Sequence, residues 1–555
     1  MQTVRRILPE GLSGRYGAGI AVLIVLAIAL LFGLLPQRDA HAEEPETLSV
    51  LARVGPWPVV SEPILYRGRL WFANSVKDVD HNSADIYSLG PGATEPRYER
   101  HLWSQDAGQP VVADRLLYWP SEDSRIFGTW GEFQVTNGED WETGLIPSEF
   151  IFHLHCMTAA QGRLYAATSA WQGTLHASED QGRTWQRIYL HPKAPKGVSR
   201  IVSLAKLENG VAGLLRDPNG FHLIVAAPEG VRIMADWPVG KSPAQLASLG
   251  GWAYGLVNRD GVRELWRSDG TVAEQVFQFT ESVRPFALTS GDGALWALSG
   301  SKGETAVLKS ADGRAWSTVA QASGGKAYDL LASEGALVVT GADADGQGIV
   351  WGRFSGSVSA AGAAPVDALH ELFGAQPSHQ IDWQDAATRL DALLAEEESY
   401  ANIGWSIRAL VFEYTMAGPP ENFFAERLHG PRATGTLNPF RDVEIADRGS
   451  IGAFWLLWGL GLAKNGTVPP NFISASWTVR ENGAAKYFEP QLMALWAAAE
   501  IGQANRATIG ALMSRITNSA DPLWLRMDAV GALSALTGAT YGADFDAWTD
   551  WYRRR

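Results

Sequence analysis

The chain has little cysteine: Cys156 is the only one in 555 residues, so no intramolecular disulfide can hold the folded state. Large packed domains must therefore supply the stability. The apolar neighbours Leu154 and Met157 predict a buried, inert thiol in preference to a nucleophile.

Charge is also scarce. Charged residues make up only 19% of the chain, the formal net charge is −14, and the longest basic block is 553–555. An acidic chain repels phosphate backbones, so this composition argues against nucleic-acid binding. Hydrophobic residues reach 46%, which excludes a mostly disordered chain. The length predicts roughly two to four domains.

Only one apolar run is long enough to cross a membrane. Three arginines within residues 1–15 precede this run at 17–36, and the small-x-small site Ala40-His41-Ala42 follows it. The order is typical of a signal peptide cleaved after Ala42, which predicts a periplasmic or extracellular protein. Because the run can also span a bilayer of ~30 Å, a retained anchor is the alternative for residues 1–42.

Similar β units follow one another between about residues 61 and 341. Each has an apolar strand, a turn and a second strand rich in aromatic or aliphatic residues. Their starts lie roughly 40 to 48 residues apart, the period of a four-stranded propeller blade. The pattern predicts a seven-bladed β-propeller over 47–356, with six or eight blades as alternatives. The last unit has only three strands, so we expect residues 47–54 to supply the fourth and close the ring.

The apolar spacing changes from two to about 3.6 residues after a short Ala/Gly/Ser linker at 357–365. Residues 366–555 are therefore expected to form an α-helical domain, in which helix-like runs end at glycines such as Gly502 and Gly538. The run at 525–538 resembles a HEAT-type helical repeat. This resemblance implies that the helices stack into a solenoid.

The sharpest motif is SEDQGRTW at 178–185, which matches the Asp-box signature S-x-D-x-G-x-T-W at every defined position. Degenerate copies stand at 310–316 and 136–141. In such a turn the carboxylate accepts backbone N–H bonds and the glycine takes a positive φ. On this motif the chain resembles the Asp-box (BNR-repeat, sialidase-like) β-propeller superfamily. The resemblance implies that the box is structural and lies away from any active site.

The sialidase catalytic elements are missing from the sequence. No Arg-Ile-Pro element stands near the propeller start, and only Arg200 and Arg284 lie where three carboxylate-gripping arginines are needed. No nucleophile elbow, Walker loop, HExxH or dinucleotide motif is present. We therefore expect a binding or scaffolding protein that is not an enzyme. The alternatives are a glycan-active hydrolase with Asp80 and Asp123 as paired carboxylates, and an envelope assembly factor.

Candidate binding residues lie at strand starts and loops expected near the axial mouth of the propeller. His153 and His155 alternate on one strand and so project to the same face, but no third metal ligand is identifiable. Ordinary hydrogen-bonded histidines in a packed channel are the alternative. The full candidate set is Asp80, His81, Asn82, Asp123, Arg125, His153, His155 and Trp171.

The segment from Asp78 to Asp85 collects several oxygen ligands and opens like a calcium loop. Ser83 stands where a glycine would turn the loop and Leu89 where a bidentate glutamate belongs, so the EF-hand pattern fails. Calcium is thus the one cofactor suggested, and a solvated turn is the alternative. We expect a protein or glycan ligand, and membrane contact only through 17–36.

Overall fold

The structure is a computed structural model, and Thr47 to Arg555 form one compact unit in it. The expected signal peptide or anchor at 1–42 and the expected linker at 357–365 lie outside the described residues. No helix within the described ranges is long and apolar enough to cross a membrane. These ranges are 44–76, 83–127, 130–147, 151–194, 196–241, 245–301, 303–333, 335–355, 369–373, 381–395, 400–428, 443–474 and 490–555.

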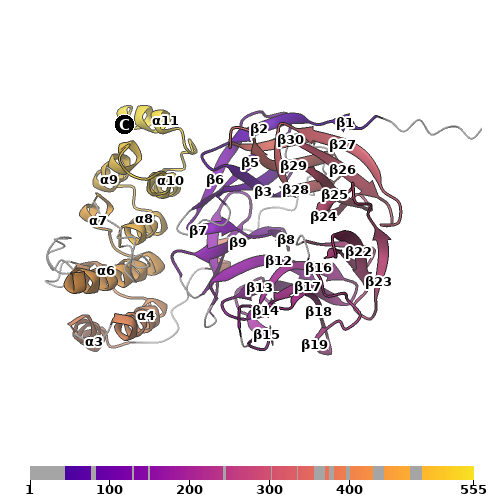
Figure 1. Cartoon of the computed structure of the whole chain (residues 1–555). Helices are drawn as coiled ribbons and strands as arrows, with labels where there is room; N and C mark the ends of the chain where they lie inside the picture. The colour runs from indigo at the N-terminus through magenta and orange to yellow at the C-terminus, as the bar shows by residue number, and fades with distance from the viewer. Residues whose placement is uncertain are drawn as a thin grey trace, which may run out of the picture. The chain divides into compact units, whose positions relative to one another are not determined.

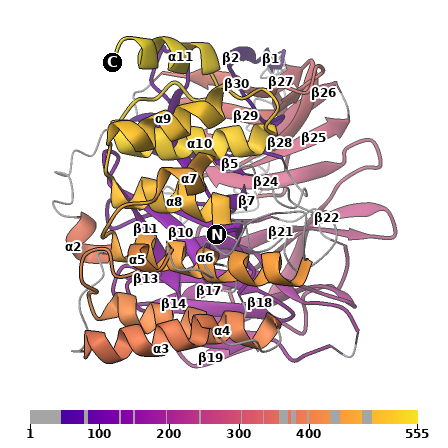
Figure 2. The same cartoon turned by 90° about the vertical axis from the view of Figure 1, so that its left-hand side faces the viewer.

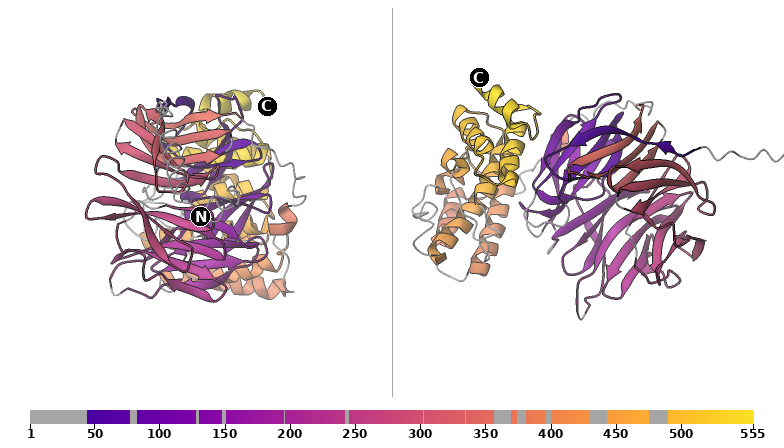
Figure 3. Two further views of the ribbon diagram at one scale, coloured as in Figure 1. Left: turned by 90° about the vertical axis from the view of Figure 1, so that its right-hand side faces the viewer. Right: turned by 45° about the horizontal axis from the view of Figure 1, so that its top comes forward.

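The first part of the chain is a β-propeller built from antiparallel sheets that follow one another around a common centre (Figures 1 and 3). Most strands are short and are buried on both faces, because each sheet packs between two neighbours. The strands are β1 (Glu46–Thr47), β2 (Ser49–Val54), β3 (Val59–Tyr66), β4 (Arg69–Ser75), β5 (Ala84–Leu89), β6 (Arg97–Leu102), β7 (Ser104–Ala107), β8 (Val111–Ala113), β9 (Leu116–Ser124), β10 (Gly131–Thr136), β11 (Trp141–Ile146), β12 (His153–Ala160), β13 (Arg163–Ser169), β14 (Gly173–Ser178), β15 (Gln186–Leu190), β16 (Arg200–Leu207), β17 (Gly210–Asp217), β18 (Gly220–Ala227), β19 (Gly230–Ile233), β20 (Leu246–Leu249), β21 (Trp252–Arg259), β22 (Val262–Ser268), β23 (Ala273–Gln278), β24 (Pro285–Gly291), β25 (Ala294–Ser301), β26 (Glu304–Ser310), β27 (Ser317–Ser323), β28 (Gly325–Ser333), β29 (Ala336–Asp343) and β30 (Gly348–Phe354).

The sheets differ from the seven separate blades that the sequence predicted. Among the described residues, five sheets have the size of one blade, and they contain β3–β6, β16–β19, β20–β23, β24–β27, and β28–β30 with β2. A sixth sheet has nine strands, because β9 pairs with β12 where Glu122 faces His153. The prediction of seven separate blades is therefore wrong: five blades are separate, and the strands of two expected units merge into one sheet.

The ring is closed by pairing between the two ends of the propeller sequence. Strand β2 pairs antiparallel with β30, from Ser49 opposite Gly352 to Val54 opposite Gly348. The N–H of Leu48 also donates to the carbonyl of Gln321 in the adjoining sheet, at 2.8 Å. The prediction that residues 47–54 supply the missing outer strand is confirmed for Ser49–Val54, while Thr47 belongs to β1, which pairs with β27 of the adjoining sheet. The β2–β30 pairing removes an open sheet edge.

The Asp-box segment forms the hairpin turn that its residues predict. The Asp180 carboxylate accepts the N–H of Thr184 at 2.9 Å and its hydroxyl at 2.6 Å, while Gly182 has φ 91°. Trp185 donates its indole N–H to the carbonyl of Gly182, and Trp316 makes the same bond to Gly313 in the second copy. The turn geometry is thus present, while membership of the superfamily stays a prediction.

Helices form the second part of the chain. Among those described, α4 packs against α6, α6 against α8, and α8 against α10 (Figure 2). Gly538 ends α10 in the left-handed conformation, with φ 68°, as expected of a helix stop. The HEAT-like solenoid stays a prediction. The helices are α2 (Leu369–Phe373), α3 (Trp383–Ala395), α4 (Tyr400–Met416), α5 (Ala425–Leu428), α6 (Val443–Ala463), α7 (Pro470–Ser474), α8 (Pro490–Ile501), α9 (Arg506–Thr517), α10 (Leu523–Thr537) and α11 (Phe545–Arg553).

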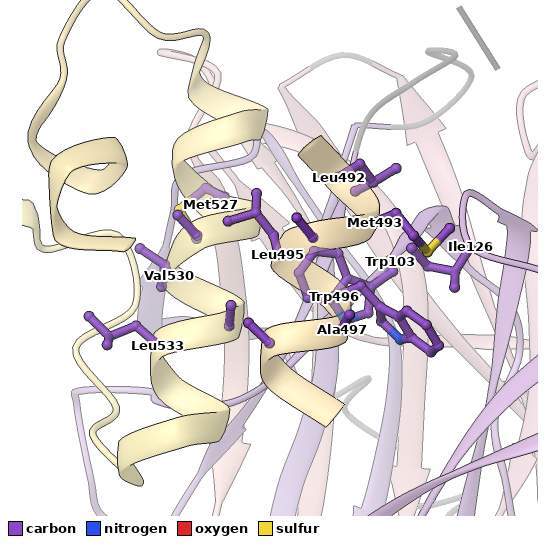
Figure 4. Packing of buried hydrophobic residues seen from close by; sticks show 14 of the residues in the cluster. Trp103, Ile126, Leu492, Met493, Leu495, Trp496, Ala497, Met527, Val530 and Leu533 are labelled. Atoms are coloured by element: carbon purple, nitrogen blue, oxygen red, sulfur yellow. The ribbon is translucent and has the colours of Figure 1, made fainter. Parts of the chain in front are cut away.

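One hydrophobic core runs from the propeller into the helices. Phe127, just after β9, packs edge-on against Trp458 of α6 and Trp496 of α8, with ring centroids 6.3 and 5.7 Å apart. Trp103 and Ile126 of the propeller lie beside Trp496 (Figure 4). Because these side chains are buried only while both parts are in place, the helices and the propeller stabilise each other.

Deleting residues 47–54 should lower the thermal unfolding midpoint by roughly 10 °C, because it leaves the edge of β30 unpaired and uncovers the core beneath β2. Differential scanning calorimetry of the purified protein measures this shift. Deletion of the exposed residues 554–555 is the control and should leave the midpoint in place. An unchanged midpoint in the first variant would contradict the closure.

Candidate functional site

The structure brings together part of the candidate set. Asp80, His81 and Asn82 lie outside the described residues, so their place at the mouth stays a prediction. Asp123 lies in β9 with a left-handed φ of 60°, directly after Glu122. The remaining candidates separate into two places, described in turn below.

His153 and His155 lie side by side at the start of β12. Their rings are stacked, with centroids 5.3 Å apart and planes 17° from parallel. Glu122 of β9 places its Oε1 3.3 Å from Nδ1 of His155 and 3.8 Å from Nδ1 of His153. Nε2 of His155 also lies 2.9 Å from the hydroxyl of Ser169. The predicted loop at 122–125 therefore meets the histidine pair through Glu122.

Two arginines from the neighbouring sheet act on this pair. Burial, together with the positive charges of His155, Arg200 and Arg216, lowers the pKa of His153 to about 4, against the opposing effect of Glu122. His153 is therefore neutral at pH 7. Arg200 begins β16 and faces Arg216 of β17 in register. Arg216 was missed by the sequence analysis because it ends a second strand, where no motif marks it.

Trp171 lies at the same end of the strands, between β13 and β14. Its side chain is 62% exposed and meets Phe152 edge-on, with ring centroids 6.2 Å apart. Its carbonyl accepts the N–H of Ser199 at 3.2 Å, and the Ser199 hydroxyl accepts the N–H of Gly173 at 2.8 Å. These bonds join the nine-stranded sheet to the β16–β19 sheet and hold the Trp171 loop beside Arg200.

A second polar cluster adjoins this loop. Asp217 lies with one carboxylate oxygen 3.1 Å from Nε2 of His222 and the other 3.7 Å from Nε2 of His191. Burial acts to raise the pKa of Asp217, but the N–H of Asn219 and the His222 ring outweigh it and hold it below its usual value. The carbonyl of His191 accepts a bond from Gln172, next to Trp171, at 2.6 Å. Asp217 and His222 lie on the two strands of the β17–β18 hairpin, but His191 follows β15, so no single sequence motif marks the cluster.

The carboxylate of Asp329 in β28 contacts two other segments of the propeller. It accepts the N–H of Glu62 in β3 and the amide of Gln245, just before β20, each at 3.0 Å. Cys156 is fully buried, and burial raises its pKa well above the usual range, with Glu62 and Glu122 raising it further. The prediction of a buried thiol is confirmed, and its lack of reactivity stays a prediction.

Arg125 lies elsewhere, at the junction with the helices. Its side chain is only 7% exposed, and its two terminal nitrogens donate to the two carboxylate oxygens of Asp528 in α10 at 3.1 and 3.2 Å. One of them also donates to the hydroxyl of Ser83. The prediction that Arg125 lines the axial mouth is therefore wrong, because its charge is needed to neutralise a buried aspartate.

His101 of β6 completes this junction. Its Nδ1 lies 2.8 Å from Asp85 of β5, and its Nε2 lies 2.9 Å from Asp528. Trp57 donates its indole N–H to the second Asp85 oxygen at 2.7 Å. Burial would lower the pKa of His101, but the two aspartates outweigh it and raise the pKa to about 9. The histidine is thus charged at pH 7, and two cations balance two buried carboxylates.

Comparisons with known proteins concern the fold alone. The sequence matches no family model and no curated protein. Among solved structures, it is similar to the Neurospora crassa Pan2 WD40 domain, with 10% identity, a TM-score of 0.40, and coverage of 56% of this chain and 97% of that one. It is also similar to YCF48 bound to D1 peptide, with 15% identity, a TM-score of 0.37, and coverage of 55% and 99%. Scores this low carry no argument about function, and the propeller is established by its own strand pairing.

His101→Gln should destabilise the protein by about 3 kcal/mol near neutral pH, because it leaves the buried Asp85 short of a cation. A histidine whose pKa rises from 6.5 to about 9 on folding adds stability that is full below pH 6.5 and is lost as the pH rises through 9. The difference in unfolding free energy between wild type and variant should shrink over that range in urea titrations. A difference that does not change with pH would contradict a charged His101, and His222→Gln is the more exposed control.

Gly531→Ala tests how closely α10 approaches the propeller. A Cβ at Gly531 would overlap the His101 side chain, whereas a Cβ at Gly510 of α9 meets only the Tyr552 hydroxyl at 3.4 Å. We expect the first substitution to cost about 1–3 kcal/mol and Gly510→Ala to be neutral or stabilising by up to about 1 kcal/mol. Equal effects of the two substitutions on urea unfolding would contradict this packing.

Proposed function

We propose that this protein is an exported binding or scaffold protein whose recognition surface is the end of the propeller around Trp171. The observation that carries the proposal is Trp171 itself. It is the most exposed large hydrophobic side chain among the described residues, and it is held in place by backbone hydrogen bonds. A fixed, exposed tryptophan surrounded by polar groups is typical of a binding surface.

The neighbouring side chains support the same proposal. The pair of His153 and His155 with Glu122 lies on one side of the Trp171 loop, and the Asp217 cluster lies on the other. Together they offer hydrogen-bond donors and acceptors around an apolar centre. This combination of a few placed polar groups and an aromatic anchor suits recognition of a macromolecular ligand.

A scaffold role is supported by the way the two parts are joined. The shared core and the charge-balanced junction of Asp528, Asp85, Arg125 and His101 hold the helices on the propeller. In our proposal the helices form a HEAT-like solenoid and provide a second recognition surface at a fixed position. Export through residues 1–42, a periplasmic or extracellular location, and kinship with Asp-box propellers belong to the same proposal, supported by the sequence order and by the turn at 178–185.

Trp171→Ala should reduce capture of partner proteins at least about tenfold, because loss of a central aromatic anchor costs about 2 kcal/mol or more. The full chain is immobilised and exposed to an extract of the envelope of its source cells, and the bound proteins are quantified by mass spectrometry. Val272→Ala is the control, because Val272 is 50% exposed in the β22–β23 turn, away from Trp171. Equal capture by wild type and Trp171→Ala would contradict the proposed surface.

A further inference from the structure

Four basic residues lie on segments next to the Trp171 loop, on the proposed recognition surface. Arg200 is half-buried and Arg216 is exposed at facing positions of β16 and β17. Lys193 and Lys196 are exposed in the segment between β15 and β16, whose ends are fixed by the bonds from His191 to Gly173 and from Ser199 to Trp171. We call these four basic residues, together with Trp171, the Trp171 basic face.

The same segment is held against the next turn, so these charges stay close to one another. Gly197, with φ 86°, lies so near Pro218 that an added Cβ would come 2.9 Å from that ring. The carbonyl of His191 accepts a hydrogen bond from the Gln172 side chain, and the Nε2 of its ring lies 3.7 Å from the Asp217 carboxylate. Lys193 and Lys196 are therefore carried by a segment that contacts both the Trp171 loop and the β17–β18 turn.

The two acids beside this face are engaged with other groups. Asp217 accepts the N–H groups of Asn219 and Gly220 and lies against His222. Glu122 lies against His155 and His153. Among the described residues named here, Lys193, Lys196 and Arg216 are exposed, whereas the Asp217 and Glu122 carboxylates are engaged, which favours a positive face in a chain whose net charge is −14. A positive surface on an acidic protein favours an acidic partner.

We propose that the Trp171 basic face binds an acidic segment of a protein partner. The inference rests on the proposed function and adds the chemistry of the ligand to it. The basic residues lie on the segment between β15 and β16 and on strands β16 and β17. Because they are spread over these elements, they can pair with several carboxylates spaced along one peptide chain. The edge-on packing of Phe152 against Trp171 makes a small apolar cluster, which an aliphatic or aromatic side chain of that segment would contact.

The test uses a fluorescein-labelled peptide in which glutamates alternate with leucines, and a matched peptide with glutamine in place of glutamate. Fluorescence anisotropy with the full chain should show binding of the acidic peptide that weakens with salt, and at least tenfold weaker binding of the glutamine peptide. The double variant Lys196→Glu/Arg216→Glu should raise the Kd for the acidic peptide at least about tenfold. Lys206→Glu is the matched control, because Lys206 is exposed near the other end of β16, opposite Val211, and the Kd should not change.

The outcomes separate this inference from the proposed function. Equal binding of both peptides, or a double variant that binds like wild type, would contradict the inference that the Trp171 basic face binds an acidic segment. Binding of hyaluronan oligosaccharides that depends on Lys196 and Arg216, with no binding of the acidic peptide, would overturn it in favour of an anionic glycan. If capture from the envelope extract depends on Trp171 but not on the basic residues, the acidic segment fails while the binding function stands.

Discussion

A buried carboxylate is the constraint that fixes how the helices meet the propeller. Asp528 lies in α10 with no exposure, and burial alone would favour its neutral form. Arg125 and His101 instead hold its pKa below the ordinary value, and both come from the propeller. If α10 moved away from the propeller, Asp528 would lose both cationic partners, and Arg125 and His101 would lose a carboxylate. The ion pairs of Asp528 with Arg125 and His101 lie within the shared hydrophobic core. Together they explain why Thr47–Arg555 form one compact unit, although the sequence indicated two domains.

The propeller has a different requirement, which is to leave no sheet edge open. The pairing of β2 with β30 joins the ends of the propeller sequence, and it makes the ring depend on residues far apart in the chain. On the inner strands, Asp329 links three sheets through Glu62 and Gln245. The strands that carry the histidine pair and the arginines are held by other pairings, β12 by β9 and β13, and β16 by β17. A recognition surface built on strand ends is thereby positioned more firmly than one on long loops.

The features predictable from the sequence were those set by local patterns. The repeat period indicated a propeller, the SEDQGRTW motif indicated its turn, and alternation placed His153 and His155 on one face. The failures arose where contacts between distant segments decide the outcome. The pairing of β9 with β12 joins two expected blades into one sheet. Arg125 binds Asp528, about 400 residues further along the chain, and so does not line the axial mouth. The cluster of Asp217 with His191 and His222 was not found from the sequence, because His191 follows β15 while Asp217 and His222 lie on the β17–β18 hairpin, and no motif links the two segments.

Arginine illustrates why residue type alone does not identify a site. Arg125 directly follows β9 and Arg216 is the next-to-last residue of β17. Arg125 is nonetheless enclosed by Ser83 and Asp528, whereas Arg216 is exposed opposite Arg200. A guanidinium whose terminal N–H groups donate to a buried carboxylate stabilises the fold, and those N–H groups are not available to a ligand. An exposed guanidinium near the end of a paired strand can donate to a ligand, and little rearrangement of the protein is needed when the ligand binds. Burial therefore separates basic residues that stabilise the folded chain, such as Arg125, from exposed ones such as Arg216, to which our proposal assigns an acidic partner.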